Sequence, residues 1–239
     1  MSSDIKLADI DVDGAIRETA AEATDTLATE GDTRADFFKK AGLAGGAVVG
    51  GGALLSALVP GSAVAAKGGK LDAPPSSFGK GDIGILNYAL TLEYLEAAFY
   101  NEANKNLKLK GASGDFLAVV VKDENAHVKF LKKALGKKAA AEPKFDFGDA
   151  TKDEDTFLAT ALALENTGVA AYAGQALNID SGDIVQAALS IHSIEARHAG
   201  LVGQIVDGKK GISPNGPFDP PAGAKATLKI VKKTGFIVS

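Results

Sequence analysis

The feature that most constrains the fold of this chain is a pair of Glu-x-x-His motifs on helix faces that are otherwise apolar. The segments DENAH (123–127) and IEARH (194–198) pair Glu124 with His127 and Glu195 with His198. Residues three apart share one face of an α-helix, so both side chains of a pair point the same way. An ionised carboxylate on a core-facing stripe costs several kcal/mol unless a partner compensates its charge. The sequence must therefore supply positive charge to these faces.

An internal repeat extends this pattern to two more glutamates. The segment ALTLEYLEAAFY (89–100) aligns with ALALENTGVAAY (161–172), which matches Glu93 with Glu165 and Tyr100 with Tyr172. Each glutamate precedes a Glu-x-x-His motif by about thirty residues and stands on an apolar stripe. No lysine or arginine lies on the four stripes. Two divalent cations would balance the four carboxylates, and carboxylate and imidazole ligands suit iron or manganese.

Helical periodicity predicts an all-α fold, an antiparallel four-helix bundle over residues 82–206. The expected helices span about 82–104, 115–135, 155–177 and 183–206. The first and third connections are short and predict hairpins, whereas 136–154 is long enough for one crossover along the bundle. The Pro/Gly-rich residues 207–239 predict an irregular C-terminal tail packed on the bundle, with room for a short strand. The side chains expected to anchor this tail are Phe218, Ile230 and Phe236.

The first 66 residues predict an export signal or leader, followed by a linker over 67–81. Residues 33–66 combine a charged start, a Gly/Ala-rich apolar stretch and an A-x-A site at Ala63 to Ala65. This pattern predicts an exported protein of the periplasm, cell envelope or extracellular space. A permanent membrane anchor is the alternative, which the glycines and weak hydrophobicity disfavour, so we expect no stable span in the mature form. TRADFFK resembles the twin-arginine export motif, with Ala35 in place of the second arginine.

Composition excludes several classes of function. The net charge of −4 and the scattered lysines and arginines argue against a nucleic-acid partner. The absence of cysteine excludes disulfides, thiolate metal sites and cysteine nucleophiles. With 239 residues, 46% of them hydrophobic, the chain can build one globular core.

Three segments carry a resemblance to a known family. LNYALTLEYLEAAFY, ALENTGVAAYAGQA and SIEARHAG resemble the ferritin-like superfamily, in particular exported bacterial ferritin-like domain proteins related to the desiccation-related proteins. The resemblance implies a ferritin-like bundle with a di-iron or di-manganese centre. The ligands that it implies are the six residues already selected by their pattern: Glu93, Glu124, His127, Glu165, Glu195 and His198.

Five neighbouring residues are candidates for supporting roles. Asp123 would orient the histidine of the opposite motif through its outer ring nitrogen, the alternative being a solvated helix acid. Glu96 has Gly168 as its counterpart in the repeat, so we expect it beside the centre or on an exposed rim, with direct ligation as the alternative. His192 is expected to be a hydrogen-bonded core or rim histidine rather than a ligand. Tyr100 and Tyr172 would border the site, either as ordinary core residues or as carriers of an oxidising equivalent.

Several reactions fit a centre that holds two divalent iron or manganese ions. Fe(II) oxidation, peroxide reduction and peroxide dismutation in stress defence all use paired metals with oxygen or peroxide. Substrate oxygenation is disfavoured because the sequence gives no sign of an organic pocket, and a storage cage is disfavoured because a Pro/Gly-rich tail replaces the fifth helix of ferritins. The competing class is a non-catalytic envelope or desiccation-stress protein whose metals are structural. The sequence assigns no catalytic residue and leaves a homo-oligomer open.

Overall fold

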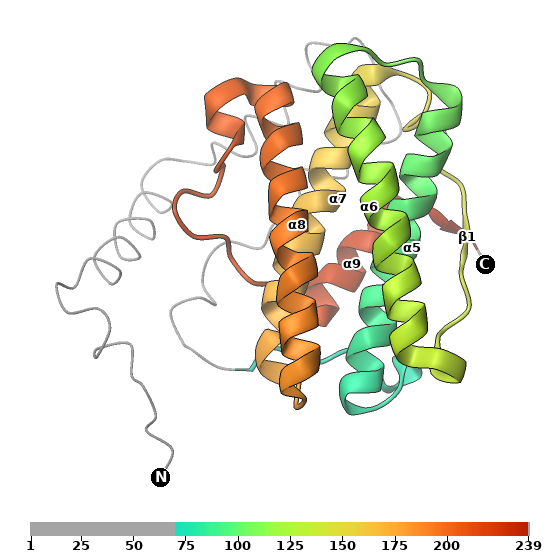
Figure 1. The fold of residues 1–239 in the computed structure, drawn as a ribbon, viewed down its shortest axis with the longest axis vertical. Coiled ribbons are helices and arrows are strands. Elements are labelled where there is room, and N and C mark those ends of the chain that lie inside the picture. The colour runs from blue at the N-terminus through green and yellow to red at the C-terminus, as the bar shows by residue number, and fades with distance from the viewer. Residues whose placement is uncertain (1–69, 239) are drawn as a thin grey trace, which may run out of the picture.

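The computed structural model describes residues 70–238, and the predicted leader lies outside this range. Four long helices form the bundle: α5 (Gly81–Asn106), α6 (Gly111–Leu135), α7 (Glu154–Gln175) and α8 (Gly182–Asp207). The hairpins α5–α6 and α7–α8 lie side by side, so that α5 and α8 run opposite to α6 and α7 (Figure 1). The predicted all-α bundle with one long crossover is therefore confirmed.

The helix ends follow from local chemistry. The Asp153 side chain accepts a hydrogen bond of 3.0 Å from the Thr156 amide and caps the start of α7. Gly136 (φ 55°) and Gly208 (φ 59°) end α6 and α8 with a backbone conformation that other residues rarely adopt. Helix α6 begins at Gly111, four residues before the predicted start, because the segment GASG has no apolar periodicity that could reveal it.

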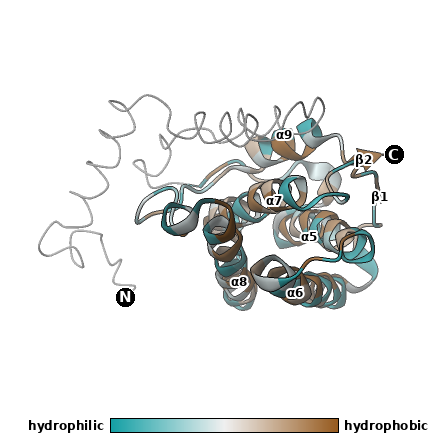
Figure 2. Ribbon diagram, turned by 90° about the horizontal axis from the view of Figure 1, so that it is seen from above, coloured by the Kyte–Doolittle hydropathy of each residue, from teal (hydrophilic) through white to brown (hydrophobic). Residues whose placement is uncertain are grey.

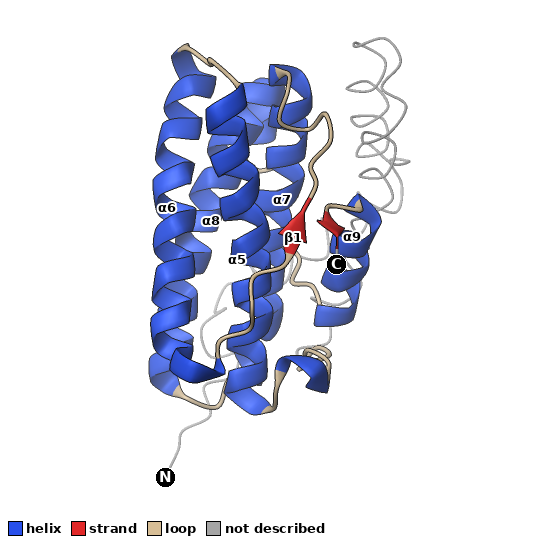
Figure 3. Cartoon of the chain, turned by 90° about the vertical axis from the view of Figure 1, so that its right-hand side faces the viewer, coloured by secondary structure: helices blue, strands red, loops and turns tan. Residues whose placement is uncertain are grey.

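The crossover between α6 and α7 contains a short 3₁₀ turn, η3 (Gly136–Lys138), and a two-residue strand, β1 (Lys144–Phe145). Strand β1 pairs antiparallel with β2 (Ile237–Val238) at the end of the tail, with Lys144 opposite Val238 and Phe145 opposite Ile237. The crossover is thereby fixed to the C-terminal end of the chain (Figure 3).

The C-terminal tail contains a 3₁₀ turn, η5 (Gly208–Gly211), and a helix, α9 (Ala224–Thr234). The prediction of an irregular tail is therefore wrong for the residues of α9. Helix α9 buries Ala224, Thr227 and Val231 and covers the α5/α7 side of the bundle (Figure 2). Its first turn is capped from far away in the sequence, because the Asp72 carboxylate accepts a 2.5 Å hydrogen bond from the Lys225 amide. The predicted linker therefore takes part in the folded domain, and it also contains η2 (Ser76–Phe78).

Two of the three expected tail anchors pack on the bundle. The Phe236 ring lies 5.2 Å from the Phe147 ring, and Ile230 on α9 is half-buried near Leu95 and Leu164 of the bundle. Phe218 is 47% exposed, so the prediction that it packs on the bundle is wrong.

The core consists of two apolar clusters at opposite ends of the bundle. One end holds a group of aromatic rings with centroid separations of 5.1–6.3 Å: Phe99, Tyr100, Phe116 and Phe157. The other end holds mainly aliphatic side chains, among them Leu86, Leu90, Leu131 and Ile191. The glutamates of the repeat lie between the two clusters. Across residues 70–238, none of the helices has the length and apolar character needed to span a bilayer.

Candidate metal centre

The four glutamates of the repeat meet at the middle of the bundle, one from each helix. All four are 0% exposed, and the two motif histidines, His127 and His198, are 9% and 4% exposed. Their ligand atoms form two groups in which all atoms lie within 4.8 Å of one another. The first group contains Glu93, Glu124, His127 and Glu195, and the second contains Glu124, Glu165, Glu195 and His198. Glu124 and Glu195 therefore belong to both groups.

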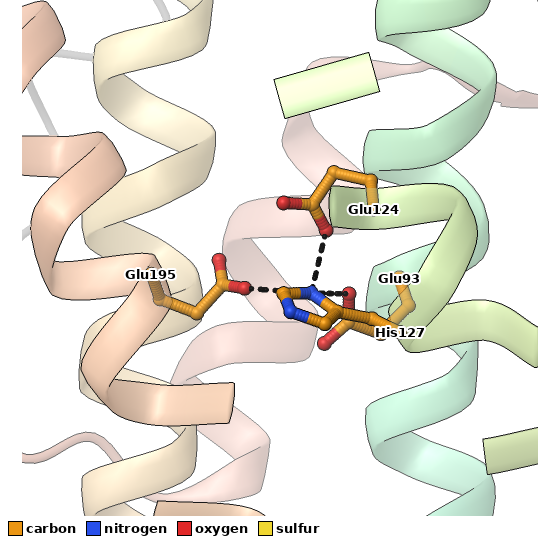
Figure 4. A group of neighbouring side chains, drawn as sticks. All are labelled: Glu93, Glu124, His127 and Glu195. Carbon is orange, nitrogen blue, oxygen red and sulfur yellow. Dashed lines mark hydrogen bonds and ion pairs between the residues drawn. The ribbon is translucent and has the colours of Figure 1, made fainter. Parts of the chain in front are cut away.

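His127 is the centre of the first group. Its Nδ1 lies 3.2 Å from Oε2 of Glu93, 3.1 Å from Oε2 of Glu124 and 3.1 Å from Oε1 of Glu195 (Figure 4). One imidazole nitrogen cannot donate to three carboxylates, because it carries at most one hydrogen. The convergence of three carboxylates on one nitrogen is typical of ligands arranged around a cation.

His198 has the same place in the second group. Its Nδ1 lies 3.1 Å from Oε1 of Glu124 and 3.3 Å from Oε2 of Glu165. The two oxygens of Glu124 thus face different histidines, Oε2 towards His127 and Oε1 towards His198. A carboxylate in this position can join two metal ions.

Several buried atoms of the centre make no hydrogen bond although they are close to one another. These atoms are Oε1 of Glu124, Oε2 of Glu165, both carboxylate oxygens of Glu195 and Nδ1 of His198. Buried polar atoms without partners are rare because each costs the free energy of its lost hydration. Each of these atoms is a metal ligand by chemistry, so a pair of divalent ions fits the donor set present.

The electrostatics of the metal-free centre show that protons occupy it. Burial and the charge of Glu93 raise the pKa of Glu124 to about 8, and burial and Glu124 raise that of Glu195 well above its usual range. Burial by itself would lower the pKa of His198, but its contacts with Glu124 and Glu165 raise it to about 11. Metal ions would therefore replace protons in this site.

The two tyrosines of the repeat donate hydrogen bonds across the centre. The Tyr172 hydroxyl on α7 donates to Oε1 of Glu93 on α5 at 2.5 Å, and the Tyr100 hydroxyl on α5 donates to Oε1 of Glu165 on α7. Burial, and next the adjacent glutamate, raise the pKa of both hydroxyls well above their usual range, so both remain donors. Each tyrosine fixes one oxygen of its glutamate and leaves the other oxygen facing a histidine.

Asp123 contacts the outer nitrogen of the opposite motif's histidine. Its Oδ2 lies 3.0 Å from Nε2 of His198. A carboxylate here favours the tautomer with hydrogen on Nε2, which leaves Nδ1 free for a metal. In the other half of the repeat Ile194 occupies the corresponding position, and its hydrocarbon side chain cannot make this contact with His127. The two halves of the centre are therefore chemically unequal.

Glu96 and His192 have different surroundings. Glu96 is 3% exposed, so the prediction of an exposed rim position is wrong for it; burial and the nearby Glu195 raise its pKa well above the usual range. Gly168 lies nearby, where a Cβ atom would be 2.9 Å from Oε2 of Glu195 but at an ordinary contact distance of 3.5 Å from Oε1 of Glu96, so the missing side chain makes room for the Glu195 carboxylate. His192 is half-buried, belongs to neither ligand group, and has a pKa lowered by burial.

The pattern that describes ferritin-like domains matches residues 81–207. This match covers all four helices of the bundle and both Glu-x-x-His motifs, and it spans more than half of the chain. No curated protein matches the chain.

Proposed function

Because the chain belongs to the ferritin-like domain family, we propose that its bundle holds two iron or manganese ions and acts as an oxidoreductase. The ions would be held by Glu93 and His127 on one side, by Glu165 and His198 on the other, and by the shared Glu124 and Glu195. Such a pair, when bound, supplies two-electron chemistry with dioxygen or hydrogen peroxide. The reaction is Fe(II) oxidation, or peroxide reduction or dismutation, in defence against oxidative stress.

The observation that carries this proposal is the division of Glu124 between the two histidines. Its Oε2 lies 3.1 Å from Nδ1 of His127 and its Oε1 lies 3.1 Å from Nδ1 of His198, and the second oxygen has no hydrogen bond. A carboxylate that only stabilised the core would pair with one donor by both oxygens or with backbone amides. The split supports two neighbouring cations.

The residues around the ligands would keep the pair in a fixed arrangement. Hydrogen bonds from Tyr100 to Glu165 and from Tyr172 to Glu93 restrain these two glutamates. Asp123 restrains His198 in the same way. Glu96 is buried beside the ligands, and burial, followed by the charges of the neighbouring carboxylates, raises its pKa well above the usual range.

A structural role for the metals is the second candidate, and one observation favours it. All four glutamates are 0% exposed, and closed ligand sets without an open position are typical of structural metal sites. Metal binding alone does not separate the two functions. Turnover of oxygen or peroxide by the metal-loaded protein does.

The experiment measures reaction rates of the protein loaded with Fe(II) or Mn(II). We expect Fe(II) oxidation faster than in protein-free buffer, or consumption of peroxide, and we expect Glu124→Ala to abolish the acceleration. The matched control is Glu142→Ala, which changes an exposed glutamate of the crossover. Two bound metals with no acceleration of either reaction would favour the structural role.

We also propose that the protein works outside the cytoplasm after export. The proposal is supported by the charged start, the Gly/Ala-rich stretch and the A-x-A site within residues 33–66.

A further inference from the structure

The candidate centre approaches the protein surface at its two histidines. The side chains of all four ligand glutamates are 0% exposed, whereas the side chains of His127 and His198 are 11% and 5% exposed. His127 lies on α6 and His198 on α8, and these two helices form the side of the bundle opposite α9 (Figure 2). A molecule that exchanges electrons with the centre would therefore come nearest to it on the α6/α8 side.

A hydrogen bond connects the centre to this side of the bundle. The Asp123 side chain is 39% exposed, and its Oδ2 lies 3.0 Å from Nε2 of His198. Nδ1 of the same imidazole ring faces the carboxylates inside the centre. Tyr100 and Tyr172, which also bind candidate ligands, are both buried. The pair of Asp123 and His198 therefore extends from solvent to the centre.

Exposed apolar residues lie beside this pair on both helices. Val119 precedes Asp123 by one turn of α6 and is 48% exposed, and Leu201 follows His198 by one turn of α8 and is 42% exposed. Because α6 and α8 run in opposite directions, both residues lie towards the same end of the bundle from the hydrogen-bonded pair (Figure 1). Two large apolar side chains on neighbouring helices form a small apolar surface that a partner can cover.

Two cations flank this apolar surface. Lys122 and Arg197 are exposed, and each directly precedes one residue of the hydrogen-bonded pair, so each stands on the outer flank of its helix. Within residues 70–238, Lys152 alone among the lysines and arginines forms an ion pair. Both cations can therefore meet negative charge on another molecule. We call the following residues the α6/α8 patch: Val119, Lys122, Asp123, Arg197 and Leu201.

Peroxide reduction, one of the proposed reactions, needs electrons from outside the chain. Conversion of one hydrogen peroxide molecule to two water molecules consumes two protons and two electrons. We propose that the α6/α8 patch docks an acidic one-electron carrier protein, two copies of which are oxidised for each peroxide that is reduced. This inference rests on the proposed function and adds the partner to it.

The patch has the composition of a transient redox interface. Such encounters bury little surface, so a small apolar area is sufficient. Opposite charges at the rim raise the rate at which two proteins meet, and salt lowers that rate by screening the charges. Lys122 and Arg197 should therefore favour an acidic carrier over a basic carrier of similar size.

The first experiment measures docking without metal. The metal-free full chain is titrated by calorimetry with oxidised plant-type ferredoxin, an acidic one-electron carrier, and with cytochrome c, a basic one. We expect ferredoxin to bind with an affinity that decreases as salt is added, and we expect cytochrome c not to bind. Equal binding of the two carriers, or binding of neither, would overturn the proposal.

The second experiment measures electron transfer from reduced ferredoxin to the oxidised, iron-loaded chain. Stopped-flow absorption should show two ferredoxin molecules oxidised for each chain. Lys122→Glu with Arg197→Glu should slow this reaction at least about tenfold at low salt, and Lys122→Gln with Arg197→Gln serves if the charge reversal disturbs folding. The control is Lys229→Glu with Lys232→Glu, which makes the same charge change at exposed positions of α9 and should react as the parent does. Equal rates for the parent and for a folded patch variant of unchanged metal content would contradict the proposal.

Ascorbate separates this proposal from the proposed function, because a small reductant needs no docking surface. Peroxide consumption by the iron-loaded chain with ascorbate but not with ferredoxin would overturn the docking proposal. No peroxide consumption with ascorbate would count against the proposed function instead, and ferredoxin binding by the metal-free chain would still decide whether the patch docks an acidic carrier.

Discussion

Removal of the Asp123 carboxylate should weaken one metal position and leave the other unchanged. The carboxylate lies 3.0 Å from Nε2 of His198, whereas Ile194 replaces it in the other half and His127 has no such contact from that position. Loss of a carboxylate behind a metal-bound histidine typically costs 10–100-fold in affinity. The Asp123 side chain is 39% exposed, so water can replace part of its effect. We therefore expect about a tenfold loss, or about 1.4 kcal/mol, for Asp123→Ala.

The assay is calorimetric titration of the metal-free full chain with Mn(II) at pH 7. One of two binding steps should weaken about tenfold in Asp123→Ala, and Asp123→Asn should fall between parent and alanine variant because its amide oxygen still accepts a hydrogen bond. Asp115→Ala, which changes an exposed aspartate of the same helix, is the control and should behave as the parent. Equal weakening of both steps, or no change in either, would refute the inference that the two halves are unequal.

Three further predictions concern stoichiometry, protons and export. Glu124→Ala or Glu195→Ala should reduce the metal content, measured by elemental analysis, below that of the parent, and full metal content in both variants would place the site elsewhere. Glu165→Ala should retain one metal and lose the near-ultraviolet absorption of a ferric pair. Metal loading should release protons, and the affinity for the metal should rise between pH 6 and 8, because the pKa of Glu124 is raised to about 8 and that of His198 to about 11 and metal must displace the protons on these groups. Potentiometry that finds no proton release on metal binding would contradict this. Metal at 100 times its Kd should also add about 2.7 kcal/mol to the free energy of unfolding. N-terminal sequencing of the natural protein should begin near Ala66, and recovery of the intact chain from the cytoplasm as the main species would contradict export.

The residues that meet at the candidate centre were predictable because two independent periodicities select them. Glu93, Glu124, Glu165 and Glu195 interrupt apolar stripes at helical spacing, and the repeat places them in register. A four-helix bundle brings such positions to one level of its core, where the structure finds all four at 0% exposure. Both signals are local or nearly local in the sequence.

The features that escaped prediction depend on contacts between distant residues. Helix α9 has a short and strongly basic sequence, and its cap comes from Asp72, more than 150 residues earlier. The space for the Glu195 carboxylate depends on a missing side chain at Gly168 of another helix.

The central claim is that this bundle holds a pair of transition-metal ions on six residues of its repeat. Elemental analysis of the protein purified from its natural host tests that claim most directly. We expect two ions of iron or manganese for each chain, and fewer than one in a Glu124→Ala and Glu195→Ala double variant prepared in the same way. Fewer than one ion per parent chain, unchanged after incubation of the metal-free protein with Fe(II) and with Mn(II), would contradict it.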